Sequence, residues 1–101
     1  MYKPLPNCVE IRTSPIHGVG LFAKTPIKKG TNLGVSHIYA PGFETSYIRT
    51  PVGGFINHSE EPNCHKIESP EESVITYFSL VVSKNIEKDE ELTITYTLYN
   101  V

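Results

Sequence analysis

The chain has 101 residues, of which 39% are hydrophobic and 10% aromatic, so it can form one domain, residues 1–101, with a single modest core. The net charge of −2 argues against a protein that grips nucleic acid, and no apolar run approaches the ~20 residues of a membrane span. Cys8 and Cys64 are too few for a disulfide scaffold. We therefore expect reduced thiols in an intracellular compartment.

The charges are unevenly distributed along the chain. Residues 1–56 carry six Lys and Arg against two acids, whereas residues 57–101 carry three Lys against nine acids. An acidic half suits a basic partner, and a solvated acidic face explains the same pattern without any partner.

Short runs of alternating or β-branched residues predict strands separated by Gly and Pro turns. Residues 39–52 read as a loop with one short strand, because three Pro and Gly residues interrupt them. No segment has the apolar spacing of a convincing helix. The expected class is therefore mainly β. In chain order, the predicted strands are residues 8–12, 17–23, 31–38, 74–82 and 91–96.

Two segments of the chain resemble each other. In residues 24–33 an apolar strand ends in Lys, and Ile27, Gly30 and Leu33 follow at intervals of three. Residues 84–92 repeat this arrangement around Ile86 and end at Leu92. The repetition predicts two related strand–turn–strand units packed about a pseudo-twofold axis.

Residues 53–64 combine two glycines, an apolar Phe-Ile pair and a cluster of small polar side chains. Pro62-Asn63 is typical of a turn, so the segment can be a structural corner. A corner does not need an apolar anchor at its start, however, and crowded polar groups beside buried residues need partners. A binding site is the alternative interpretation, and both remain open from these residues alone.

Three segments occur in an order that is more specific than any one of them: Gly18–Ala23 with its Gly-x-Gly, Asn57–Asn63 with Asn-His-Ser, and Glu91–Tyr96 with Glu-Leu-Thr. Together they resemble the SET domain, the fold of most protein-lysine methyltransferases, over residues 9–99. The resemblance implies a β-clip fold of short strands and small sheets. It also implies a C-terminal pseudo-knot, in which the end of the chain passes through the loop that carries Asn-His-Ser.

The resemblance implies S-adenosylmethionine as the cofactor. We expect no metal, because the histidines show no ligand spacing and Cys64-His65 is not a zinc motif. In the family, backbone around the Gly-x-Gly cups the cofactor, which here corresponds to Gly18, Val19 and Gly20. The family's Asn-His pair touches the methionyl amino group and the adenine, which corresponds to Asn57 and His58. Glycine suits the first role because a side chain would block a close backbone approach.

The resemblance also implies the chemistry: methyl transfer to the ε-amine of a lysine in a protein such as a histone or histone-like tail. Tyr96, at the end of the Glu-Leu-Thr strand, corresponds to the family's catalytic tyrosine. Tyr99 is a candidate for lining the lysine channel, and it can equally be an ordinary packing residue. A β-clip module that has lost catalysis and binds a peptide or small ligand is the alternative function.

The chain departs from the family pattern in two ways. Many members carry a Cys after Asn-His-Ser and a trailing Cys cluster that binds zinc, whereas this chain has Glu60 and no such cluster. Only 36 residues separate Gly20 from Asn57, so the usual insert is short. We therefore expect a homodimer, or the end of the chain, to close the lysine channel. The expected location is the cytoplasm, or the host nucleus if the protein is viral.

Overall fold

The computed structural model describes residues 4–43 and 46–96. Within them the chain is mainly β, as predicted, and no helix there is long and apolar enough to cross a membrane. In chain order the elements are β1 (Val9–Thr13), β2 (Val19–Ala23), β3 (Asn32–Tyr39), β4 (Tyr47–Arg49), α1 (Pro51–Gly54), β5 (Asn57–His58), β6 (Cys64–Glu68), β7 (Tyr77–Val82) and β8 (Glu91–Ile94).

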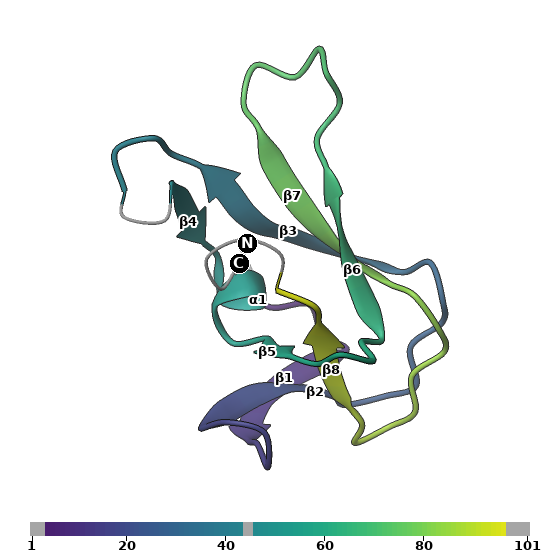
Figure 1. The fold of residues 1–101 in the computed structure, drawn as a ribbon. Helices are drawn as coiled ribbons and strands as arrows, with labels where there is room; N and C mark the ends of the chain where they lie inside the picture. The colour runs from purple at the N-terminus through teal and green to yellow at the C-terminus, as the bar shows by residue number, and fades with distance from the viewer. Residues whose placement is uncertain (1–3, 44–45, 97–101) are drawn as a thin grey trace.

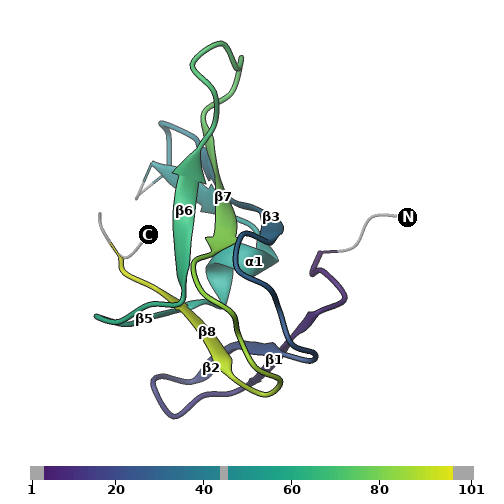
Figure 2. The same cartoon turned by 90° about the vertical axis from the view of Figure 1, so that its right-hand side faces the viewer.

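The strands form two small sheets. The first has the order β1-β2-β8-β5 and the second β4-β3-β7-β6. β5 pairs with β8 in parallel, and all other paired strands are antiparallel. The first sheet lies at the bottom of Figure 1, and the β6–β7 hairpin projects from the top of both ribbon views (Figures 1 and 2). In Figure 1, β5 lies between the β1–β2 hairpin and α1.

The internal repeat in the sequence is confirmed by an antiparallel bridge between its two copies. The Ile27 amide donates to the Ile86 carbonyl and the Ile86 amide donates to the Ile27 carbonyl, both at 2.8 Å. Each copy then turns through a residue with positive φ, at Gly30 (90°) in the first and Asp89 (71°) in the second. Corresponding residues are therefore 59 positions apart in the sequence.

Each turn is also bonded to a strand end of the other half. The Val82 amide donates to the Thr31 carbonyl at 2.9 Å, and its counterpart Ala23 donates to the Glu90 carbonyl at the same distance. The hairpins β1–β2 and β6–β7 are likewise counterparts. These pairs establish the predicted pseudo-twofold arrangement of the two units.

The buried core contains residues from both halves of the chain. Leu21 and its counterpart Leu80 are fully buried, as is Leu92. Burial of side chains of this size contributes about 1.5–3 kcal/mol each. The large side chains with less than 2% exposure are Leu21, Ile56, Leu80, Ile86, Leu92, Ile94, His37 and Val82.

The one-turn helix α1 was not predicted. Thr50 caps it: its hydroxyl donates to the Val35 carbonyl at 2.6 Å and accepts from the Gly53 amide at 3.5 Å. Pro51 occupies the first turn, where its missing N–H costs nothing. A Cβ on Gly53 would collide with the Ser36 carbonyl, so glycine lets the helix pack directly on β3. Strands β5 and β6 were also missed, whereas all five predicted strand segments and the short strand within 39–52 are present.

Candidate functional site

A cleft of about 590 Å³ opens where the β1–β2 turn, α1 and β5 meet. This volume lies within the range of small-molecule and cofactor sites. The end of β4 and the residues after β8 complete its lining. The residues that line it are His17, Gly18, Val19, Arg49, Gly54, Phe55, Ile56, Asn57 and Tyr96.

The two glycines of the β1–β2 hairpin are needed for different structural reasons. Gly18 adopts a φ of 45°, and a Cβ added there would meet nothing within 4 Å, so the backbone is exposed to the cleft. A Cβ on Gly20 would collide with the Glu91 carboxylate and lie 2.9 Å from the Asn57 side-chain nitrogen. Gly20 is therefore required by its protein neighbours, whereas Gly18 presents backbone to the cleft.

The side-chain nitrogen of Asn57 is surrounded by acceptors. It lies 2.8 Å from Glu91 Oε2, 3.0 Å from the Val19 carbonyl, 3.1 Å from Ser14 Oγ and 3.3 Å from the His17 carbonyl. Asn57 itself is 7% exposed. By donating to the His17 and Val19 carbonyls, the Asn57 amide group therefore fixes the position of the glycine hairpin.

These contacts also decide which way the Asn57 amide faces. The Ser14 hydroxyl donates to Glu91 at 2.8 Å, so its oxygen is an acceptor toward Asn57. Four acceptors on one side require the NH₂ group there and not the carbonyl oxygen. No described residue donates to Asn57 Oδ1, and Asn57 lines the cleft. The site thus offers one fixed acceptor.

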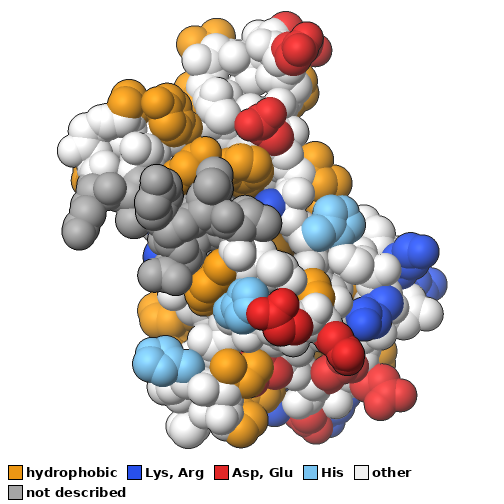
Figure 3. Space-filling view, viewed as in Figure 1, with side chains coloured by type: hydrophobic (Ala, Val, Ile, Leu, Met, Phe, Trp, Pro, Cys, Tyr) orange, Lys and Arg blue, Asp and Glu red, His pale blue; other side chains and the backbone are white. Residues whose placement is uncertain are grey.

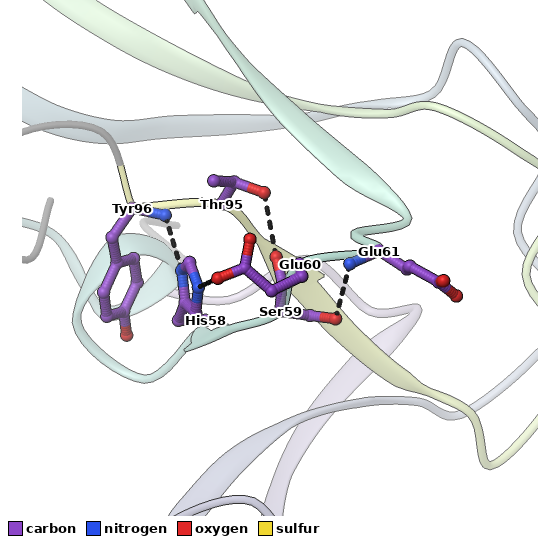
Figure 4. A network of polar contacts seen from close by, with 6 residues as sticks. All are labelled: His58, Ser59, Glu60, Glu61, Thr95 and Tyr96. Atoms are coloured by element: carbon purple, nitrogen blue, oxygen red, sulfur yellow. Dashed lines mark hydrogen bonds and ion pairs between the residues drawn. The ribbon is translucent and has the colours of Figure 1, made fainter.

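His58 holds the backbone that follows β8 (Figure 4). The Tyr96 amide donates to His58 Nδ1 at 2.8 Å, and Nε2 lies 3.1 Å from Glu60 Oε1. Since Nδ1 accepts, the proton of the neutral ring must be on Nε2, where it is donated to Glu60. His58 does not line the cleft among the described residues; it positions Tyr96.

The rest of the central polar segment binds the C-terminal strand residue by residue (Figure 4). The Ser59 amide donates to the Ile94 carbonyl at 2.9 Å, and the Thr95 hydroxyl donates to the Ser59 carbonyl at 2.8 Å. Asn63 Oδ1 accepts from the Thr93 amide at 2.8 Å. The segment therefore serves both interpretations: Asn57 lines the cleft, and the residues after it fasten β8. The pseudo-knot itself stays a prediction.

Tyr96 places a neutral phenol at the cleft. Its hydroxyl donates to the Ile56 carbonyl at 2.7 Å, and its ring centroid lies 5.2 Å from that of His58. Burial raises the pKa of Tyr96 above its ordinary value, and the charge of Arg49 lowers it by less. Because the Tyr96 hydroxyl donates its proton to the Ile56 carbonyl, its oxygen can accept a hydrogen bond from a ligand.

The fold brings most of the predicted site residues together, although none of their roles is tested by this. Gly18, Val19, Asn57 and Tyr96 line the cleft, Gly20 lies directly beneath it, and His58 lies behind Tyr96. Tyr99 is outside the described residues.

Sequence reasoning missed Ser14, Arg49 and the particular role of Glu91. Glu91 could have been found, since it begins the Glu-Leu-Thr motif. Ser14 and Arg49 belong to no motif and reach the site only through the fold. Over residues 4–43 and 46–96, no three His, Cys, Asp or Glu side chains gather in a way that could hold a metal ion.

Acidic side chains gather over β5, β8 and the turn before β8 on the face shown in Figure 3. Five acids of these segments are exposed; Lys88 lies among them, and Arg12 pairs with one of them, Asp89, at 2.9 Å. The five acids are Glu60, Glu61, Glu87, Asp89 and Glu90. The negative second half of the sequence is therefore a negative surface beside the C-terminal strand.

Comparisons with known proteins bear on the fold and the family of the chain. No curated protein matches the chain. A crystal structure named "Plasmodium falciparum putative histone methyltransferase" is similar with a TM-score of 0.72, at 20% identity, over 91% of this chain and 95% of the other. At this identity the likeness shows the fold. The family model of the SET domain matches residues 41–97, more than half of the chain. The chain therefore belongs to the SET domain family.

Proposed function

We propose that the protein is an S-adenosylmethionine-dependent protein-lysine methyltransferase. The observation that carries this proposal is that segments far apart in the sequence meet in one cleft of cofactor size. Gly18 and Val19 come from the first hairpin, Asn57 from β5 and Tyr96 from the segment after β8. Family membership alone would not require these residues to share a cleft in this chain.

The residues of the cleft fit this cofactor. Asn57 Oδ1 is an acceptor with no described donor, which suits the ammonium group of the methionyl end. The exposed backbone at Gly18 permits close approach, and Val19, Phe55 and Ile56 give apolar surface for an aromatic base. When bound, S-adenosylmethionine supplies an electrophilic methyl group on its sulfonium sulfur.

The protein's own part in the reaction is to select and orient a neutral amine. A lysine side chain with a pKa near 10.4 must lose its proton before its nitrogen can attack a methyl group. A desolvated site favours this loss because it disfavours the charged form. The Tyr96 oxygen and the nearby Ile56 carbonyl are acceptors that can orient the amine. Such positioning alone can lower a barrier by several kcal/mol.

The acidic surface supports a basic, lysine-containing substrate such as a histone-like tail (Figure 3). The Plasmodium protein's name refers to histones, which supports the same substrate class. Because the insert between the glycine hairpin and Asn57 is short, closure of the cleft by a second copy, or by the end of the chain, is part of the proposal. We propose an intracellular location on the basis of the reduced cysteines.

Calorimetric titration with S-adenosylmethionine tests the cofactor, with the Asn57→Ala and Asn85→Ala variants compared with wild type. Asn85 is an exposed asparagine whose amide oxygen accepts from Lys29 far from the cleft, so its replacement is the matched control. We expect binding by wild type and Asn85→Ala, and loss of at least tenfold in affinity for Asn57→Ala.

Methyl transfer is then tested with radiolabelled cofactor, on lysine-rich proteins and on the same proteins with acetylated lysines. Incorporation of label into the unacetylated proteins only, with a large loss of this activity in Tyr96→Phe, supports lysine methylation. Cofactor binding without transfer to any basic protein would instead favour the module that has lost catalysis. Absence of cofactor binding by wild type would overturn the proposed function.

A further inference from the structure

β1 lies at one end of the first sheet, and its outer side is open. The Ser14 amide donates to the Gly18 carbonyl at 2.9 Å, just beyond the β1–β2 ladder, so the even-numbered residues of β1 are the ones bonded to β2. The backbone groups of Val9, Ile11 and Thr13 therefore face away from β2. No described residue bonds to the amides of Ile11 and Thr13. β1 thus presents unpaired backbone groups along its outer edge.

The other edge strands of the two described sheets are protected against pairing, whereas β1 is not. β5 and β4 have only two and three residues, and β6 carries Lys66 at its centre. Short edges and lysine side chains are common means of preventing contact with another chain. β1 has five residues, contains no Lys, Pro or Gly, and keeps a regular register with β2. Its central residue, Ile11, is apolar and 40% exposed. An open edge of this kind is suited to pairing with a further strand.

The sequence of β1 is complementary to itself in the antiparallel direction. When two copies are aligned about Ile11, each Ile11 lies opposite the other, and Glu10 of each copy lies opposite Arg12 of the second. Val9 lies opposite Thr13 in the same way. Opposite charges and pairs of β-branched residues are stabilising cross-strand neighbours. A second copy of the chain therefore matches this edge in charge and in shape, which a strand of arbitrary sequence does not.

We propose that the protein forms a twofold-symmetric dimer, in which β1 of one copy pairs antiparallel with β1 of the other about Ile11. The two Ile11 residues exchange hydrogen bonds, and the Thr13 amide of each copy donates to the Val9 carbonyl of the other. The Val9 amide takes no part, because it donates to the Pro6 carbonyl at 3.3 Å within its own chain. The pairing joins the two first sheets into one, and Leu21, the β2 partner of Ile11, continues the apolar row on each side.

The charged residues of β1 already interact with each other, and they keep the capacity for a contact between copies. Arg12 Nε lies 2.8 Å from Glu10 Oε2, and one terminal nitrogen lies 2.9 Å from Asp89 Oδ1. A guanidinium has five N–H groups, so the other terminal nitrogen can donate to Glu10 of the second copy. The Arg12 and Glu10 side chains are 32% and 40% exposed, so a second strand can reach both. Exposed charge pairs of this kind fix the register and the choice of partner more than the affinity.

Sedimentation equilibrium over concentrations from about 1 µM to 1 mM tests the dimer and its register. We expect wild type to be dimeric within this range. Glu10→Arg places two arginines opposite each other and Arg12→Glu two glutamates, so each variant alone should dissociate about tenfold more readily. A mixture of the two variants restores opposite charges at both positions and should form a heterodimer about as stable as the wild-type dimer. Glu68→Arg, the same charge reversal on edge strand β6, is the matched control and should leave the dimer unchanged.

Wild-type protein that is monomeric at about 1 mM overturns the proposal. A dimer that both charge reversals leave unchanged, or weakened variants that mixing does not restore, overturns the pairing through β1. The pairing does not depend on the proposed activity. Calorimetry with S-adenosylmethionine tests that function separately, so failure of the dimer leaves the proposed function standing.

Discussion

The two halves of the molecule share a scaffold and differ at the cleft. The Ile27–Ile86 bridge and the paired turns relate residues 59 positions apart. The same offset relates Gly20 to Ser79 and Glu91 to Asn32. In the second sheet these positions carry the ordinary strand residues Ser79 and Asn32, whereas in the first sheet Gly20 and Glu91 belong to the network that positions Asn57. The candidate site is therefore found where the symmetry between the halves is broken.

The strongest test of this comparison replaces Gly20 and its counterpart in the same way. Gly20→Ala should abolish cofactor binding and lower the free energy of unfolding by on the order of 4 kcal/mol. The added methyl group overpacks the site and displaces the Glu91 carboxylate from its partners. Ser79→Ala, at the equivalent position, should change stability by less than about 0.5 kcal/mol. Urea unfolding and calorimetry measure both. Equal effects of the two substitutions would show that the broken symmetry has no consequence.

The second test compares the pH dependence of stability at His37 and at Tyr96, which are also 59 positions apart. Burial lowers the pKa of His37 from 6.5 to about 4, with smaller contributions from Lys66 and Arg49. The unfolded chain thus binds a proton at pH values where the native state does not. Stability from this group is complete above pH 6.5 and decreases as the pH falls toward 4, by roughly 3 kcal/mol.

Thermal unfolding between pH 4 and 8 measures this slope. His37→Gln should flatten the part of the profile below pH 6.5. Tyr96→Phe should leave that part unchanged, because burial raises the pKa of Tyr96 and the phenol stays neutral throughout this range. A wild-type profile with the same slope as His37→Gln would contradict the prediction.

The smallest of the three effects is expected at Glu91 and Asn32. Glu91→Gln should weaken S-adenosylmethionine binding about tenfold and cost about 2 kcal/mol of stability, since the neutral amide is a poorer acceptor for Ser14 and Asn57. Asn32→Asp should be nearly neutral, because the Asn32 oxygen that accepts from the Gly34 amide is kept. An affinity for the cofactor that Glu91→Gln leaves unchanged would exclude the positioning role of Glu91.

The scaffold was more predictable from the sequence than the site. Alternating apolar residues identify β2 and β8, and the repeat around Ile27 and Ile86 predicts how the halves pack. The two-residue strand β5 escapes such reasoning, because Asn57 and His58 are polar and their pairing is with β8.

For the site, the motifs indicate Asn57 and Tyr96, yet they do not indicate what each side chain does. That His58 bonds the Tyr96 backbone, or that Ser14 reaches Glu91, depends on contacts 38 and 77 residues apart. Arg49 enters the cleft because β4 ends beside α1, which no local pattern contains. Short-range patterns predict elements, and long-range contacts create the chemistry.

The bridge between Ile27 and Ile86 also bears on how the chain folds. Each hairpin can form early from local contacts, whereas the bridge closes a loop of about 60 residues at an entropic cost on the order of 4 kcal/mol. Docking of the two hairpins is therefore the expected slow step of folding. Asn57, Gly20 and Glu91 come from three segments that meet only in the docked state, so the cleft should be the last part of the molecule to form.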